Sequence, residues 1–116
     1  MTKEEMKLYE YYRSIPIGKS NAVSRGQLCS MWNTNDRTVR LIIADIRSNC
    51  RRLGMAYYVL SDSHGKGYWK SGDHAEIRAF NAQMMSRIMS ILPALENAKQ
   101  YIGDSSQQDL FGGRYQ

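Results

Sequence analysis

The 116-residue sequence has few cysteines, few prolines and no long hydrophobic run. Cys29 and Cys50 are too few for a disulfide-framed mini-protein, so we expect reduced, partly buried thiols, with a disulfide between them as the alternative. No stretch approaches the roughly 20 apolar residues that span a bilayer, so we expect no integral membrane protein. The first residues are charged and lack the apolar region of a secretory signal. These absences predict a cytoplasmic protein with one compact domain.

Motifs for catalysis, cofactors and metals are also missing. Gly18-Lys19-Ser20 resembles the end of a phosphate loop, but the position five residues before Gly18 is Arg13 rather than the required glycine. The cysteines and histidines have no zinc-ligand spacing, and no nucleophile lies in a motif with a candidate base. We expect a protein that is not an enzyme and that holds no cofactor or metal.

The sequence does contain a basic middle segment. Residues 13–72 carry ten Lys or Arg against three Asp, a net charge of +7, whereas residues 1–12 and 73–116 carry −1 each, which gives +5 for the chain. A basic segment between near-neutral ends favours a module that binds a polyanion, nucleic acid before others. A domain with a basic surface and no such partner is the alternative.

Hydrophobic periodicity predicts three helices in the first half of the chain. The first covers about residues 4–14 and ends before Pro16. The second covers Arg25 to Trp32, with Ser24 as its N-cap. The third runs from about Asn35 to Arg52.

Two stripes follow the third helix. Asn33 and Asp36 resemble a capping box at its start, and Gly54 is the natural stop. The apolar seam is Val39, Ile42, Ile43, Ile46, Cys50 and Leu53. A second stripe, about 100° around the helix, consists of Arg37, Arg40, Ala44, Arg47 and Arg51. One face then packs inward while an adjacent face presents four guanidinium groups; a solvated face paired with Asp36 and Asp45 is the alternative.

A β-hairpin follows the three helices. Residues 56–60 and 68–70 are rich in strand formers, and the polar segment between them includes His64 and Lys66. The predicted fold class is mainly α with a small β-hairpin, that is, a winged helix-turn-helix with a long C-terminal helix. The expected organisation is a winged-helix domain over 1–72, the long helix over 73–102 and a flexible tail over 103–116.

Residues 4–72 carry a resemblance to a known family. The run Asn35–Arg47, with its polar cap, Arg-Thr-Val-Arg start and Ile or Leu spaced by three, resembles the recognition helices of bacterial and bacteriophage winged-helix proteins. Gly54, the following strand and Gly67-Tyr68-Trp69 are similar to the wing of that family. The resemblance implies a helix whose N-terminal half enters the major groove of DNA.

The resemblance also implies which residues contact DNA. Near the bases we expect Asn35, Arg37, Thr38 and Arg40, since arginine can bind guanine and asparagine can bind adenine through two hydrogen bonds. The residues that we expect to contact phosphates are Lys19, Arg25, Arg47 and Arg51. Lys66 and, less specifically, His64 lie at the tip of the wing, where they could reach the minor groove or flanking phosphates.

A long helix is expected from about His74 to Ile102, with Asp73 as its cap. Its apolar positions are spaced 3, 4, 4, 3, 4, 3 and 4 residues apart, close to a heptad repeat. Pro93 should kink this helix or begin a new one. We expect a homodimer through Ile77, Phe80, Met84, Ile88, Ile91 and Leu95; packing on the chain's own core is the alternative.

A second resemblance lies in the tail. Gln107-Gln108-Asp109-Leu110-Phe111 resembles the peptide with which bacterial replication and repair proteins bind the sliding clamp, a glutamine, any residue, Ser or Asp, leucine and phenylalanine. The resemblance implies that Leu110 and Phe111 enter an apolar pocket while Gln107 bonds at its rim and Asp109 fills the Ser or Asp position. A tail whose Leu-Phe pair packs on the domain is the alternative.

Together these features predict sequence-specific binding of double-stranded DNA by a bacterial or prophage winged-helix protein, in transcription regulation or in replication of a mobile element. The alternative function is a protein-interaction adaptor that docks on the sliding clamp through its tail.

Overall fold

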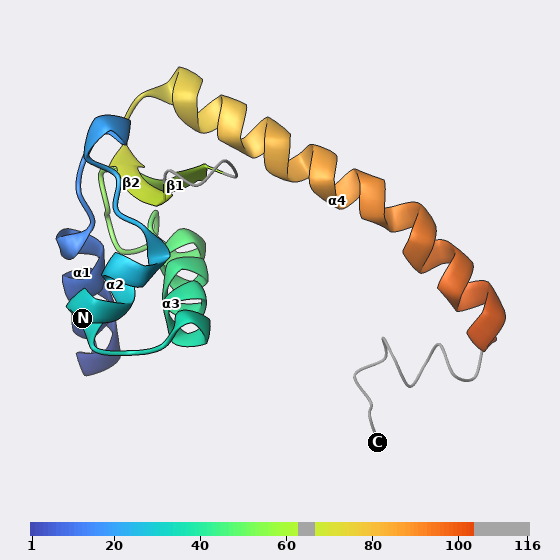
Figure 1. The fold of residues 1–116 in the computed structure, drawn as a ribbon, viewed down its shortest axis with the longest axis horizontal. Coiled ribbons are helices and arrows are strands. Elements are labelled where there is room, and N and C mark those ends of the chain that lie inside the picture. Colours follow the sequence, from blue (N-terminus) through green and yellow to red (C-terminus); the bar gives the residue numbers. More distant parts are fainter. Residues whose placement is uncertain (63–66, 104–116) are drawn as a thin grey trace. The chain divides into compact units, whose positions relative to one another are not determined.

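The computed structural model describes residues 1–62 and 67–103 (Figure 1). Its elements are α1 (Lys3–Ser14), the short 3-10 helix η1 (Lys19–Asn21), α2 (Arg25–Trp32), α3 (Asp36–Asn49), β1 (Tyr58–Asp62), β2 (Gly67–Ser71) and α4 (His74–Ile102). This order confirms the predicted fold class, mainly α with a small β-hairpin followed by a long helix. A compact first unit spans residues 1–80, and a second begins at Asn81.

Capping boxes begin the first two helices. The Thr2 hydroxyl accepts from the backbone N–H of Glu5 at 3.1 Å, and the Glu5 carboxylate accepts from the Thr2 N–H at 2.8 Å. Ser24 and Gln27 make the same reciprocal pair at the start of α2, as predicted for the Ser24 cap. Each box satisfies backbone donors that the first helical turn cannot pair.

The start of α3 differs from the predicted capping box. Asn33 adopts a left-handed conformation at φ 53° and closes α2, where its N–H donates to the carbonyls of Cys29 and Ser30. The N-cap is Asn35, whose side-chain oxygen accepts from the Thr38 N–H at 2.8 Å. The prediction was wrong because asparagine tolerates the left-handed region that ends a helix as readily as it caps one.

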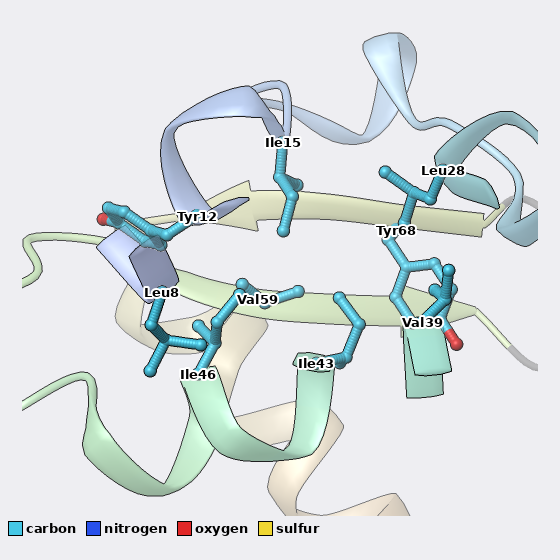
Figure 2. Close-up of a cluster of buried hydrophobic side chains, with 9 residues drawn as sticks. All are labelled: Leu8, Tyr12, Ile15, Leu28, Val39, Ile43, Ile46, Val59 and Tyr68. Atoms are coloured by element: carbon cyan, nitrogen blue, oxygen red, sulfur yellow. The ribbon is translucent and has the colours of Figure 1, made fainter. Parts of the chain in front are cut away.

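The core of the first unit lies between the three helices and the hairpin (Figure 2). Its buried side chains are Leu8 and Tyr12 of α1, Ile15, Leu28 of α2, Val39, Ile43 and Ile46 of α3, Val59 of β1 and Tyr68 of β2. The predicted seam of α3 therefore supplies the core, while Ile42, Cys50 and Leu53 are half-buried at its edge. Both cysteines are free thiols.

The hairpin is held by a pairing that local sequence patterns did not predict. β1 and β2 are antiparallel, with Val59 opposite Lys70 and Leu60 opposite Trp69. On its other edge, β2 pairs with Ile17 and with Val23, whose N–H donates to the Tyr68 carbonyl at 3.0 Å. Two short stretches before α2 thereby extend the sheet.

Gly67 allows this close approach. Its φ is +88°, and a Cβ at this position would lie 2.0 Å from the Val23 carbonyl oxygen. Glycine is therefore required on two independent grounds, the backbone conformation and the space.

The opposite face of the hairpin is also buried. Leu60 and Trp69 share this face and are 1% and 4% exposed. Lys19 of η1 lies over the Trp69 ring, with its Nζ 5.7 Å from the centroid. At the start of α4, the Phe80 ring lies 6.2 Å from that of Tyr58. The compact unit consequently extends to Phe80 rather than ending near residue 72.

α4 is continuous from His74 to Ile102 with Pro93 inside it, so no new helix begins there. In the part of the chain that the structure describes, no helix has the length and apolarity to cross a membrane.

Candidate nucleic-acid interface

The exposed side of α3 is the candidate interface. Positions along an α-helix advance by about 100° per residue, so Leu41 lies about 200° and Ser48 about 180° from buried Val39. The side facing away from the core therefore consists of Arg37, Leu41, Ala44 and Ser48, all exposed, and we call it the outer side of α3. The inner side consists of Val39, Ile43, Ile46 and Arg47.

Arg37 is the free cation on the outer side. It lies one residue into α3, and its side chain makes no ion pair or hydrogen bond with any residue in 1–62 or 67–103. Its guanidinium therefore keeps all five donors for a partner. A cation at the N-terminal end of a helix gains nothing from the helix dipole, so helix stability does not explain its position.

Asp36 holds two further predicted DNA-binding residues. Its carboxylate pairs with Nε of Arg25 at the start of α2 and with Nε of Arg40 on the next turn of α3 at 3.3 Å. Hydrogen bonding with Tyr68, and then with Asp36, raises the pKa of Arg25. One carboxylate thus serves two guanidiniums, so Arg25, Arg37 and Arg40 together with Asp36 leave a local net charge of +2.

Arg47 does not face outward, and its predicted place among the exposed guanidiniums is wrong. Its Nε donates to the Val59 carbonyl at 2.9 Å and its Nη2 to the Ser61 hydroxyl at 3.2 Å, while the guanidinium lies 4.8 Å from the Phe80 ring centroid. Burial lowers the pKa of Arg47. The reason is geometric. Arg47 follows Val39 by eight residues, which places it only about 80° around the helix from this buried residue.

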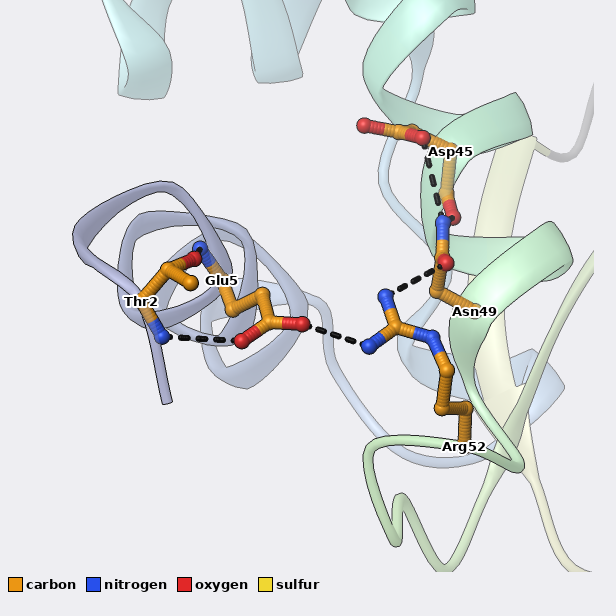
Figure 3. Close-up of polar contacts among 5 residues, drawn as sticks. All are labelled: Thr2, Glu5, Asp45, Asn49 and Arg52. Atoms are coloured by element: carbon orange, nitrogen blue, oxygen red, sulfur yellow. Dashed lines mark hydrogen bonds and ion pairs between the residues drawn. The ribbon is translucent and has the colours of Figure 1, made fainter.

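Asp45 forms no ion pair with an arginine among the described residues. Figure 3 shows its carboxylate accepting from Asn49, at 3.1 Å, while Arg52 pairs with Glu5 of α1. Among the described residues, neither Arg37 nor Arg51 pairs with an acid. The alternative prediction was that Asp36 and Asp45 pair with the arginines of α3. Among the described residues, Asp36 forms such a pair and Asp45 does not.

The other predicted contacts lie on the hairpin side and in the first turn of α3. Lys19 pairs with Asp62 at 3.4 Å and stays 56% exposed. Asn35 is exposed, but its side-chain oxygen already caps the helix, and Thr38 is half-buried. His64 and Lys66 lie outside the described residues.

Two features of the site were missed from the sequence. The bond between Asp36 and Arg25 of α2 is one, because no local pattern indicates it, whereas the pair of Asp36 with Arg40 at i and i+4 was expected as the alternative. Leu41 is 58% exposed at the centre of the outer side, and counting half a turn from Val39 would have found it.

The predicted dimerisation residues fall into two groups. Ile77 and Phe80 are half-buried in the first unit, where Phe80 packs on Tyr58 and Arg47. In the second unit, Ile88, Ile91 and Leu95 are about half exposed, at 49%, 50% and 48%. Beside them, Met85, Met89 and Leu92 are exposed as well, which makes an apolar face about half the helix circumference wide.

The predicted clamp-binding residues Gln107, Asp109, Leu110 and Phe111 lie outside the described residues. Within the described ranges, no three His, Cys, Asp or Glu side chains gather where they could hold a metal ion. In the comparisons with known proteins, no family model, no curated protein and no solved structure matches this chain.

Proposed function

We propose that this protein is a non-enzymatic winged-helix protein that binds double-stranded DNA sequence-specifically, as a bacterial or bacteriophage regulator of transcription or of mobile-element replication. The observation that carries the proposal is Arg37, an exposed guanidinium without an acidic partner in the described chain, at the first turn of α3. Arg25 and Arg40 lie beside it around a single carboxylate. Such a surface suits a polyanion.

The roles of the side chains follow from their positions. With α3 in the major groove, Arg37 on the outer side faces the base edges, where a guanidinium binds guanine O6 and N7 through two hydrogen bonds. Arg40 lies at about 100° from Val39, on the edge of the outer side, and binds phosphates. Arg51, which is exposed in the turn after α3, binds a phosphate beyond the end of the helix. Arg25, which shares Asp36 with Arg40, extends this phosphate-binding edge. Lys19, which lies against the hairpin, binds a flanking phosphate.

A second copy of the chain is the proposed partner of α4. The apolar face of the second unit includes Met84, Ile88, Ile91 and Leu95 at the 3 and 4 spacing by which like helices pack together. Residues 82–95 contain one charged residue, Arg87, so little opposes the pairing of two identical helices. A dimer would bring two α3 helices to two half-sites of one DNA molecule.

DNA binding is tested with the full chain. A preferred duplex is selected from a random pool, and its affinity is measured by electrophoretic shift over a salt series. Arg37→Ala should weaken binding to this duplex by about 10- to 100-fold, because a bidentate guanine contact is lost. Arg78→Ala, the same change at an exposed position of α4, should alter it by less than about twofold.

Three results contradict the proposal. Failure of the pool to yield any bound duplex would favour the adaptor alternative. An affinity that is independent of salt would exclude a phosphate interface. Equal losses from Arg37→Ala and Arg78→Ala would show general charge attraction without a groove contact.

Self-association is tested by sedimentation equilibrium. The double change Ile88→Glu and Ile91→Glu should convert the dimer to a monomer, because it places charge in the apolar face. Ser86→Glu and Ser90→Glu add the same charge outside that face and should leave the dimer intact. A wild-type monomer, or equal effects of both pairs, would contradict the proposed interface.

A further inference from the structure

The outer side of α3 contains an apolar centre within its cationic surroundings. Leu41 is 58% exposed, and Ala44, one turn further, is also exposed. Arg37 precedes Leu41 by one turn, and Arg40 adjoins it along the chain. An exposed leucine is ordinary by itself, but this one lies at the centre of the face that the proposed function places in the groove.

The chemistry of the major groove offers one apolar group at the base edges, the C5-methyl of thymine. A partner of Leu41 must lie among negative charges that attract Arg37 and Arg40 and must itself be apolar. Double-stranded DNA combines these features. Double-stranded RNA does not, since its major groove is deep and narrow, and uracil has no methyl group.

The charges on the two edges of the outer side orient the helix. Arg40 lies on one edge, while Asp45 lies on the other, about 240° from Val39, with its carboxylate on Asn49. The DNA backbone therefore runs along the arginine edge, and Leu41 lies between the two edges, over the bases.

We propose that Leu41, supported by Ala44, is a specificity-determining residue that contacts the methyl group of a thymine in the DNA site. This inference rests on the proposed function. It adds that each half-site of the preferred duplex contains one thymine whose methyl group contributes to affinity, beside the guanine bound by Arg37.

The test replaces thymine by deoxyuridine, which removes only the methyl group. In the selected duplex, each thymine is replaced singly and the dissociation constant of the full chain is measured by fluorescence anisotropy. At one position in each half-site the single replacement should weaken binding by about fourfold, the effect of one buried methyl group. The other positions should change by less than about 1.5-fold.

The variants assign this effect to a side chain. Leu41→Ala should bind the thymine and deoxyuridine duplexes equally, because the two changes remove the same contact. Ser48→Ala, on the same side of α3, should keep the fourfold difference. Leu41 is largely exposed, so its truncation should leave the helical circular dichroism unchanged.

The outcomes separate this inference from the proposed function. If no duplex binds, both fail. If a duplex binds and no deoxyuridine position matters, the proposed function stands and the thymine contact is overturned. If Leu41→Ala keeps the full fourfold difference, another residue makes the contact and the role of Leu41 is overturned.

Discussion

The two sides of α3 use the same residue types for different purposes. On the inner side, Arg47 bonds to Val59 and Ser61 and lies against Phe80, so its charge joins the helix to the hairpin and to α4. On the outer side, Arg37 is exposed and has no partner in the described chain. The difference teaches that arginine content alone does not define a DNA-binding surface, because the angle from the buried seam decides which guanidiniums are available.

The largest effect on the free energy of unfolding is expected in the hairpin that packs against the inner side of α3. Gly67→Ala should destabilise the protein by about 3 kcal/mol or more, since its Cβ would collide with the Val23 carbonyl in addition to the backbone strain. Gly54→Ala is the matched control. It also has a positive φ, +71°, but nothing lies within 4 Å of its Cβ, so about 1 kcal/mol is expected. Urea unfolding measures both, and equal losses would mean that the sheet does not need this close approach.

Core truncation compares the two sides directly. Ile46→Ala should cost about 3 kcal/mol, because Ile46 is fully buried and its loss leaves a cavity. Leu41→Ala should change the free energy of unfolding by less than about 0.5 kcal/mol. Thermal or urea denaturation gives both values. A large loss for Leu41→Ala would indicate that the outer side is packed.

Replacement by glutamine compares the buried guanidinium of Arg47 with the exposed guanidinium of Arg51. Arg47→Gln should lower the free energy of unfolding by about 2 kcal/mol, since two hydrogen bonds from a charged donor to β1 are lost. Arg51→Gln should leave stability within about 0.5 kcal/mol and weaken DNA binding instead. A loss of stability from Arg51→Gln together with a loss of DNA binding from Arg47→Gln would contradict these assignments.

The smallest effect is expected at Glu5, where α1 meets the chain after α3 (Figure 3). Hydrogen bonding from Arg52 and from the Thr2 backbone lowers the pKa of Glu5 from 4.5 to about 2. A carboxyl group whose pKa is lower in the folded state stabilises the fold above its unfolded value, and this contribution is lost as the pH falls from about 4.5 to about 2. Wild-type protein should therefore lose more stability than Glu5→Gln over this range. Parallel pH profiles for the two proteins would show that the ion pair contributes nothing.

The sequence predicted the elements whose signals are local. Ser24 begins α2 as expected, Val39, Ile43 and Ile46 form the seam, and the hairpin follows α3 with β1 displaced by two residues from the expected 56–60. The position of Arg47 was predicted wrongly because the arginine stripe was placed one residue, about 100°, around the helix from the buried seam. The exposed side of the helix lies half a turn, about 180°, from that seam.

Other features needed tertiary structure. The pairing of Ile17 and Val23 with β2 joins segments about 50 residues apart, and no pattern of spacing or propensity indicates it. Asp36 was expected as part of a cap or, as the alternative, as a partner of the arginines on its own helix, but its bond to Arg25 depends on how α2 packs against α3. The requirement for glycine at position 67 follows from that same sheet pairing.

The shared carboxylate of Asp36 has a consequence for how a complex would form. Because Arg25 and Arg40 are already fixed at one anchor, much of their rotational freedom is lost before any ligand arrives. Arg37 and Arg51, which have no acidic partner among the described residues, are left to become ordered upon contact, so the entropic penalty of association falls mainly on these two side chains. The same carboxylate cancels one of the three guanidinium charges, so the attraction for phosphates in general is weaker than three unpaired arginines would give.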